Sequence, residues 1–347
     1  LVVVSNSITK SNNKLDYIKS NINNHELLVM NKTWNSEPDI PGIKKSFERV
    51  NSFQPDWIIA IGGGSVIDGA KIVWAYYEHP ELYDRIDNVD FLKIPKLRGK
   101  SRFIAIPTTI GTGSEVSSSA ILFNKDSGRK IPIVSIDFLP DVVVLDPKFV
   151  VGLPREHMVA TIIDACTHCI EGYVSKIKNQ LMDHFALASL KIMFENKYKL
   201  LDNPENEQLI INLQYAAMMA GWVQNHCLVG VSHAISHQMG AFNIPHGVAN
   251  SIFLPESIIL NKSDKSSLLK YEKIATFCGL KNGVEDLEFK LLDFVKKGKF
   301  SIKLSKYGLK SKILSKIAEN ALQDPVAQYN PLPLRHEKIV EIMEKNL

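Results

Sequence analysis

Short apolar runs alternate with polar stretches along the first part of this chain. Four runs have the continuous apolar character of buried strands: Glu26–Met30, Asp56–Ile61, Phe103–Ile106 and Asp141–Leu145. Between them, apolar residues recur at helical spacing, for example in Gly42–Phe53 and Val66–Tyr77. Buried strands separated by helices predict a parallel α/β sheet that is covered on both faces.

The pattern changes near Leu153–Pro154. Before this point, residues 117–134 alternate apolar and polar positions around Asp126–Gly128, which predicts a hairpin. After it, we expect helices at Arg155–Val174, Leu181–Phe194, Glu207–Val223, Val231–Phe242 and Glu337–Leu347. We therefore predict two domains, an α/β domain over residues 1–152 and an all-α domain over residues 153–347. The length of 347 residues supports two domains.

Composition excludes several classes of function. The net charge of +4 is mild and spread along the chain, so we expect no nucleic-acid partner. No apolar run reaches the ~18 residues that span a bilayer, so we expect no membrane partner. The apolar stretch at Leu1 is four residues long and lacks a signal-peptide pattern. The four cysteines show no regular spacing, and we expect them reduced in a cytoplasmic protein.

One segment is rich in residues that bind metals. His233, His237 and His246 fall within fourteen residues, and upstream Asp164 and His168 are four apart. Residues at i and i+4 share one face of a helix, so two helices and a loop histidine can converge on one cation. A carboxylate with imidazoles suits Zn or Fe(II) better than Ca or Mg. Not all five need be ligands, and a lone histidine on an apolar helix is often a core residue.

Two loops follow predicted strands in the first domain. Gly62–Gly64 leads into a helix, where backbone N–H groups and the helix dipole favour a phosphate. We expect a pyrophosphate to rest on Gly63, Gly64 and Ser65, as in a Rossmann-like dinucleotide-binding domain, although the loop is neither the G-x-G-x-x-G fingerprint nor a Walker loop. The hydroxyl-rich loop Pro107–Glu115 could hydrogen-bond phosphate, ribose or amide groups. A tight structural turn and a hydroxyl-rich surface turn are the alternatives.

Together these segments resemble the iron-containing, or group III, alcohol dehydrogenase family. The matching motifs, in order, are Gly62–Ser65 with Asp68, Pro107–Glu115, Leu145–Pro147, Asp164–His168 with Glu171, His233–Gly247, and Asp324 with Asn330–Pro331. The resemblance implies a fold like that of dehydroquinate synthase and covers nearly the whole chain. It also implies metal ligands at Asp164, His168, His233 and His246, with His237 near the substrate and nicotinamide.

The resemblance further implies which residues contact the cofactor. They are Asn31, Gly63, Gly64, Ser65, Asp68, Thr108, Thr109, Thr112 and Lys130. Many NAD-preferring members have an acidic residue at the position of Asn31, which binds the ribose 2′-hydroxyl and repels a 2′-phosphate. Asn31 does neither strongly, and Lys32 adds a positive charge, so both NAD(H) and NADP(H) stay open.

The implied function is metal-dependent hydride transfer between a nicotinamide and a small primary alcohol or aldehyde. Phosphonoacetaldehyde is a narrower candidate substrate, because the segment Thr33–Pro38 looks similar to that subgroup of reductases. We expect His237 to relay protons, and we expect a homodimer or a higher homo-oligomer. The alternatives are a dehydroquinate-synthase-like lyase and a non-catalytic nucleotide- or metal-binding protein.

Overall fold

The computed structural model describes residues 1–22, 25–35, 37–82, 93–124 and 129–347. Its internal contacts divide the chain into two compact units. The first comprises residues 1–109 and 113–151, and the second comprises residues 110–112 and 152–347. Each unit is described by itself below.

The first unit is built on a five-stranded sheet in which every neighbouring pair of strands is parallel. The strand order is β2 (Val29–Asn31), β1 (Val2–Val4), β3 (Trp57–Gly62), β4 (Arg102–Pro107) and β7 (Val142–Val143). The predicted parallel α/β architecture is therefore confirmed. Strand β1 lies inside the sheet and was not predicted, because three valines are too short a run to reveal a period.

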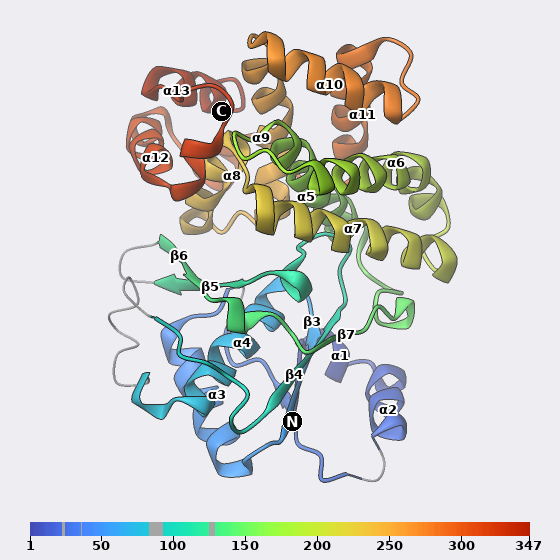
Figure 1. Ribbon diagram of the computed structural model, residues 1–347, viewed down its shortest axis with the longest axis vertical. Coiled ribbons are helices and arrows are strands. Elements are labelled where there is room, and N and C mark those ends of the chain that lie inside the picture. The colour runs from blue at the N-terminus through green and yellow to red at the C-terminus, as the bar shows by residue number, and fades with distance from the viewer. Residues whose placement is uncertain (23–24, 36, 83–92, 125–128) are drawn as a thin grey trace. The chain divides into compact units, whose positions relative to one another are not determined.

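Helices cover both faces of this sheet, as the continuous apolar strands require. Val3 belongs to a core cluster with apolar residues of α3 (Ile40–Phe53) and α4 (Gly64–Glu78). Val2 and Val4 belong to a second cluster with residues of α1 (Asn6–Thr9) and α2 (Asn12–Asn21). Figure 1 shows the two helix pairs on opposite sides of the strands.

The predicted hairpin is present in the first unit. Strand β5 (Ser119–Asn124) pairs antiparallel with β6 (Arg129–Val134), and Ala120 lies opposite Ile133. The predicted turn at Asp126–Gly128 lies outside the described residues. The hairpin packs on α4, since Ala120, Leu122 and Ile133 join the core cluster of that helix.

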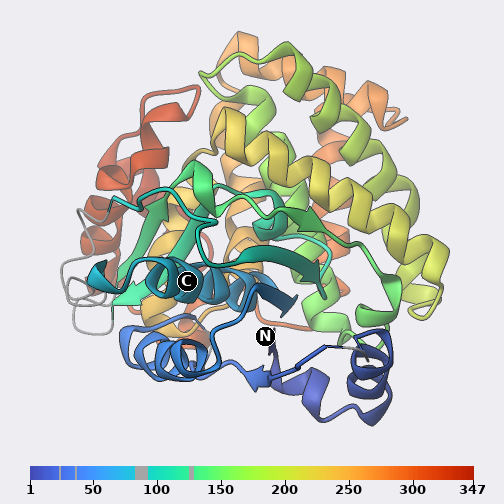
Figure 2. The ribbon, with the colours of Figure 1, turned by 60° about the horizontal axis from the view of Figure 1, so that its bottom comes forward.

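The second unit is helical, as predicted. Helix α5 packs against α6, α7 and α9, and it is buried from Met158 to Val174 apart from Thr161. Figures 1 and 2 show α6 and α7 side by side. None of the described helices is long and apolar enough to cross a membrane. The longer helices are α5 (Arg155–Val174), α6 (Gln180–Asp202), α7 (Glu207–Cys227), α9 (His246–Asn261), α10 (Lys265–Phe277), α11 (Gly283–Lys296), α12 (Ser311–Gln323) and α13 (His336–Glu344).

Two details of the histidine segment differ from the prediction. The single helix expected over Val231–Phe242 is α8 (Val231–Ser236) followed by a 3-10 helix (His237–Phe242), which ends at Asn243 in the left-handed conformation. His246 is the first residue of α9 rather than a loop residue, with Pro245 at the N-cap position. The Pro-His-Gly sequence suggested a loop, but proline is well tolerated at a helix start. Helices α9 to α12 were not predicted.

Candidate active site

Four of the predicted metal-binding residues come together in the second unit. Asp164 and His168 lie one turn apart on α5, His233 lies on α8, and His246 begins α9. The Asp164 Oδ1 atom is 3.9 Å from His168 Nε2, 3.9 Å from His233 Nε2 and 3.6 Å from His246 Nε2. For Asp164, His168 and His233, one potential ligand atom of each lies within 4.8 Å of the others.

The donor chemistry of this cluster fits a divalent transition metal. The side chain of His246 is 26% exposed, while the other three are buried. Burial first, and then the neighbouring His233, hold the pKa of His168 well below its ordinary value, against the opposing effect of the Gly111 backbone. His168 is therefore a neutral imidazole with a lone pair, which is the form that binds metals. One carboxylate with imidazole nitrogens suits Zn or Fe(II).

Glu171 fixes the orientation of His233. Its Oε2 atom lies 2.7 Å from His233 Nδ1, and its Oε1 accepts a 2.7 Å hydrogen bond from the Ser232 N–H. A proton held on Nδ1 by this carboxylate leaves the lone pair of Nε2 directed at Asp164. Glu171 follows His168 by three residues on α5. The sequence motif included Glu171 but gave no role to its side chain.

Asn250 is a central residue that sequence reasoning missed. Its Oδ1 accepts hydrogen bonds from the hydroxyls of Ser232 and Ser236, at 3.0 and 2.8 Å. Its Nδ2 is thereby turned to the cluster, where it donates to Asp164 Oδ1 at 2.7 Å and lies 3.1 Å from His233 Nε2. The available signal was its position one helical turn after His246 on α9.

His237 lies beside the cluster with a carboxylate partner of its own. Its Nδ1 atom is 2.9 Å from Oδ2 of Asp324, and its ring stacks on His246 with centroids 5.5 Å apart. Burial opposes ionisation of Asp324, but His237 and the Val326 N–H together hold the pKa of Asp324 below its ordinary value. Asp324 is 87 residues from His237 in sequence, and its role could not be predicted from spacing.

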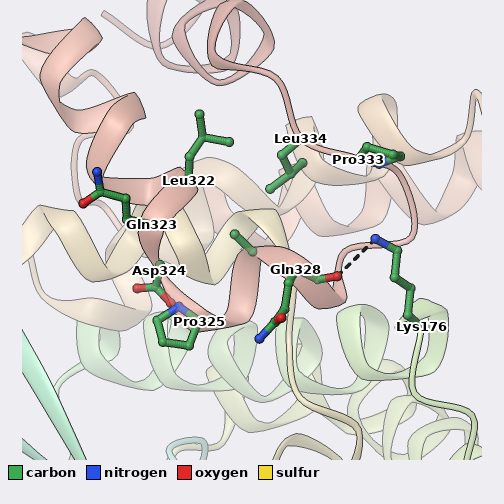
Figure 3. Close-up of a pocket in the computed structure, with 9 residues that line it drawn as sticks. Lys176, Leu322, Gln323, Asp324, Pro325, Gln328, Pro333 and Leu334 are labelled. Atoms are coloured by element: carbon green, nitrogen blue, oxygen red, sulfur yellow. Dashed lines mark hydrogen bonds between the residues drawn. The ribbon is translucent and has the colours of Figure 1, made fainter.

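Asp324 also lines a pocket of about 350 Å³ in the second unit. Figure 3 shows Lys176 on one side of this pocket, donating a 3.1 Å hydrogen bond to the backbone carbonyl of Gln328. Leu322, Pro325 and Leu334 add apolar surface. The pocket therefore offers both polar and apolar surface next to the partner of His237.

The glycine loop adjoins the start of the second predicted cofactor loop in the first unit. Helix α4 begins at Gly64, directly after β3, and the Thr108 N–H donates to the Gly62 carbonyl at 3.0 Å. A Cβ atom on Gly63 would lie 3.1 Å from Cγ2 of Thr109, so a side chain there would crowd the second loop. The first N–H groups of a helix have no partner within it, so they can bind an anion.

Other predicted cofactor residues have protein partners. Asp68 is buried and accepts a 3.1 Å bond from the Ile121 N–H, and burial raises its pKa to about 6. Lys130 pairs with Glu37 at 2.6 Å, and exposed Asn31 accepts a 3.0 Å bond from the Thr9 hydroxyl. Thr112 belongs to the second compact unit, whereas Thr108 and Thr109 belong to the first.

Comparison with known proteins decides the family. Residues 1–147 match the family described as iron-containing alcohol dehydrogenase, and residues 158–347 match the C-terminal region of the same family. The chain belongs to the iron-containing alcohol dehydrogenase family. This dehydrogenase is 36% identical over 322 residues to an NADPH-dependent butanol dehydrogenase of Clostridium saccharobutylicum, and the alignment covers 89% of this chain and 81% of that relative.

Solved structures agree with this assignment. The dehydrogenase is similar to a 1,3-propanediol oxidoreductase, with a TM-score of 0.89 and 26% identity, covering 100% of this chain and 91% of that one. It is also similar to an iron-containing alcohol dehydrogenase of Thermococcus thioreducens, with a TM-score of 0.87 and 29% identity, covering 99% and 91%. A metal-binding Asp/His site and an NAD(P) cofactor are typical of the family. These relatives give no support to a phosphonoacetaldehyde reductase, to a lyase or to a non-catalytic binding protein.

Proposed function

We propose that this dehydrogenase interconverts small primary alcohols and aldehydes, using a divalent metal held by Asp164, His168, His233 and His246. The supporting observation is the convergence of three imidazole nitrogens from three helices on one carboxylate oxygen, each 3.6 to 3.9 Å from that oxygen. Bound Fe(II) or Zn would supply Lewis acidity toward the substrate oxygen, and the nicotinamide would exchange hydride with the adjacent carbon.

The residues around the ligands would orient them and move protons. Glu171 and Asn250 would hold the ring of His233 and the carboxylate of Asp164 in place. Asp324 would hold Nδ1 of His237, so that Nε2 of His237 is the atom that exchanges a proton with the substrate or water. The side chain of His237 is 24% exposed, which leaves it accessible for this exchange.

The cofactor would bind through the loops of the first unit. Gly63, Gly64 and Ser65 at the start of α4 would carry the pyrophosphate. The remaining predicted contacts are Asn31, Asp68, Thr108, Thr109, Thr112 and Lys130. The butanol dehydrogenase of Clostridium saccharobutylicum is NADPH-dependent, but it is only 36% identical to this chain. The choice between NAD(H) and NADP(H) therefore depends on the residues that this chain itself has around the cofactor.

Aldehyde-dependent oxidation of NADH and NADPH by the metal-loaded protein tests the proposal. A panel of small aldehydes should include phosphonoacetaldehyde, the narrower candidate. We expect His237→Ala to keep the metal and the fold and to lower the turnover by about 100-fold or more, the typical cost of a lost acid–base group. The matched control is His226→Ala, an exposed histidine of α7. Wild-type turnover in His237→Ala would exclude His237 from proton transfer.

A homodimer or a higher homo-oligomer is also proposed. Val134, Ile136 and Val142 of the first unit expose 65%, 72% and 41% of their surface, and association would remove this apolar surface from water. Light scattering coupled to gel filtration measures the mass. A monomer at micromolar concentration would contradict this part of the proposal.

A further inference from the structure

The carboxyl end of β2 lies at the same sheet edge as the glycine loop. Strand β1 pairs in parallel with both β2 and β3, with Val4 opposite Asn31 on one side and Ile61 on the other. The N–H of Lys32 continues this ladder with a 2.9 Å bond to the Val4 carbonyl. In doubly wound sheets, the residues that follow such a strand contact the adenosine ribose of a dinucleotide.

Lys32 directs its charge toward the start of α4. Its Nζ atom lies 3.3 Å from the hydroxyl of Ser65, and it also donates to the carbonyl of Asn35. The neighbouring Trp34 anchors this segment, since its Nε1 donates to the Ser65 carbonyl at 3.0 Å. The ammonium of Lys32 is thus held beside the first turn of α4, where the pyrophosphate is proposed to bind.

Acidic groups near Lys32 do not cancel this charge. The strand ends in the neutral Asn31, and the nearby carboxylate is that of Glu37, which pairs with Lys130 at 2.6 Å. The Lys130 side chain is only 7% exposed, so this pair is largely removed from water. Partial burial lowers the pKa of Lys32, and Glu37 opposes that shift. Lys32, Lys130 and Glu37 together carry a net charge of +1, and the neighbouring carboxylate of Asp68 interacts favourably with Lys71.

We propose that the cofactor is NADP(H) and that the ammonium of Lys32 binds its 2′-phosphate. An acidic residue at this position binds the ribose diol of NAD, whereas a basic residue accommodates the 2′-phosphate of NADP. Asn31 repels neither cofactor, and Lys32 would attract the additional 2′-phosphate that only NADP(H) carries. The inference rests on the proposed function, because it places the adenosine ribose of a dinucleotide at this edge.

Binding of two fragments without nicotinamide tests the assignment directly. The fragments are 2′-phospho-ADP-ribose and ADP-ribose, titrated calorimetrically into the full-length, metal-loaded protein. We expect the phosphorylated fragment to bind at least about tenfold more tightly, as expected for a hydrogen bond between charged groups. Because neither hydride transfer nor an aldehyde is involved, this measurement does not depend on the substrate.

Variants of Lys32 separate recognition from a structural role. Lys32→Ala should bring the ratio of the two affinities to about 1–3, with ADP-ribose binding unchanged within about twofold. Lys32→Arg should retain the preference, because the charge stays. The control Lys45→Ala removes an exposed lysine of α3 and should leave the ratio unchanged. Thermal unfolding measurements check that each variant is folded. If Lys32→Ala does not fold, the ratio of the two fragment affinities in the wild-type protein still tests the assignment.

Two results would overturn the assignment. One is a wild-type protein that binds ADP-ribose as tightly as its 2′-phosphate, and the other is a ratio that survives in Lys32→Ala. Either result, with ADP-ribose still bound, would leave the proposed function intact. Failure of the wild-type protein to bind either fragment would contradict the proposed dinucleotide site and this assignment together.

Discussion

Replacing Glu171 by glutamine tests whether the carboxylate behind His233 supports the metal site. Glu171 is 2% exposed and accepts hydrogen bonds from the Ser232 N–H and from His233 Nδ1, both at 2.7 Å. Glutamine has nearly the same shape, but one of its two polar atoms is an NH₂ group. That group must face one of the two donors, so one hydrogen bond becomes a contact between donors.

The expected magnitude follows from these contacts. Loss of a hydrogen-bonded partner behind a ligand typically costs about 10- to 100-fold in metal affinity, which corresponds to about 1.4–2.8 kcal/mol. A buried donor left without an acceptor costs about 1–3 kcal/mol of folding free energy. We therefore expect Glu171→Gln to weaken metal binding and to lower the stability of the metal-free protein.

Competition with a chromogenic chelator measures the metal affinity, and denaturant unfolding of the metal-free protein measures the stability. The matched control is Glu156→Gln, an exposed glutamate in the first turn of the same helix, which should leave the metal affinity unchanged. If folded Glu171→Gln binds the metal within about twofold of the wild type, then Glu171 does not support the ligand His233.

Three further changes test other parts of the structure. Metal analysis of His246→Ala should show loss of stoichiometric metal, and full occupancy would remove His246 from the ligand set. Gly69→Ala should lower the free energy of unfolding by about 1–3 kcal/mol, because the new Cβ would lie 2.1 Å from Cζ2 of Trp34; an unchanged thermal midpoint would contradict this packing. Glu78 is buried, which opposes its ionisation, but the backbone N–H groups of residues 99–101 hold its pKa below the ordinary 4.5. The ionised Glu78 therefore stabilises the fold above about pH 4.5, and this stabilisation is lost as the pH falls through the lower pKa of the folded state. Glu78→Gln should have a lower free energy of unfolding than the wild type at pH 7. In denaturant titrations, this difference in free energy should narrow below pH 4.5. A gap independent of pH would contradict it.

The parts of the fold that the sequence predicted are those governed by local geometry. Helix α5 matches the predicted span because its apolar residues continue over five turns, and one turn of helix fixes Asp164 next to His168. Strands β3 and β4 have long apolar runs and were also predicted closely. By contrast, β1 has only three residues, which is too short a run to predict a strand. It lies inside the sheet because it pairs with β2 on one edge and with β3 on the other.

The parts of the site that were missed depend on contacts between distant segments. Asn250 contacts Asp164 across 86 residues, and the Ser232 hydroxyl fixes its amide across 18. Asp324 reaches His237 across 87 residues. No periodicity carries such information, since the fold alone brings these residues together. Asp324 was visible in the sequence only as part of a terminal motif.

The same local arrangement serves two histidines with different proposed roles. His233 and His237 each hold a carboxylate at Nδ1, from Glu171 at 2.7 Å and from Asp324 at 2.9 Å. A carboxylate partner therefore does not by itself distinguish a metal ligand from a proton carrier. Their positions do: Nε2 of His233 lies 3.9 Å from Asp164 Oδ1, the atom that the other proposed ligands also approach, whereas the carboxylate contact of His237 is with Asp324. This contact with Asp164 supports assigning ligation to His233, and the 24% exposure of His237 leaves it accessible for proton exchange with substrate or water.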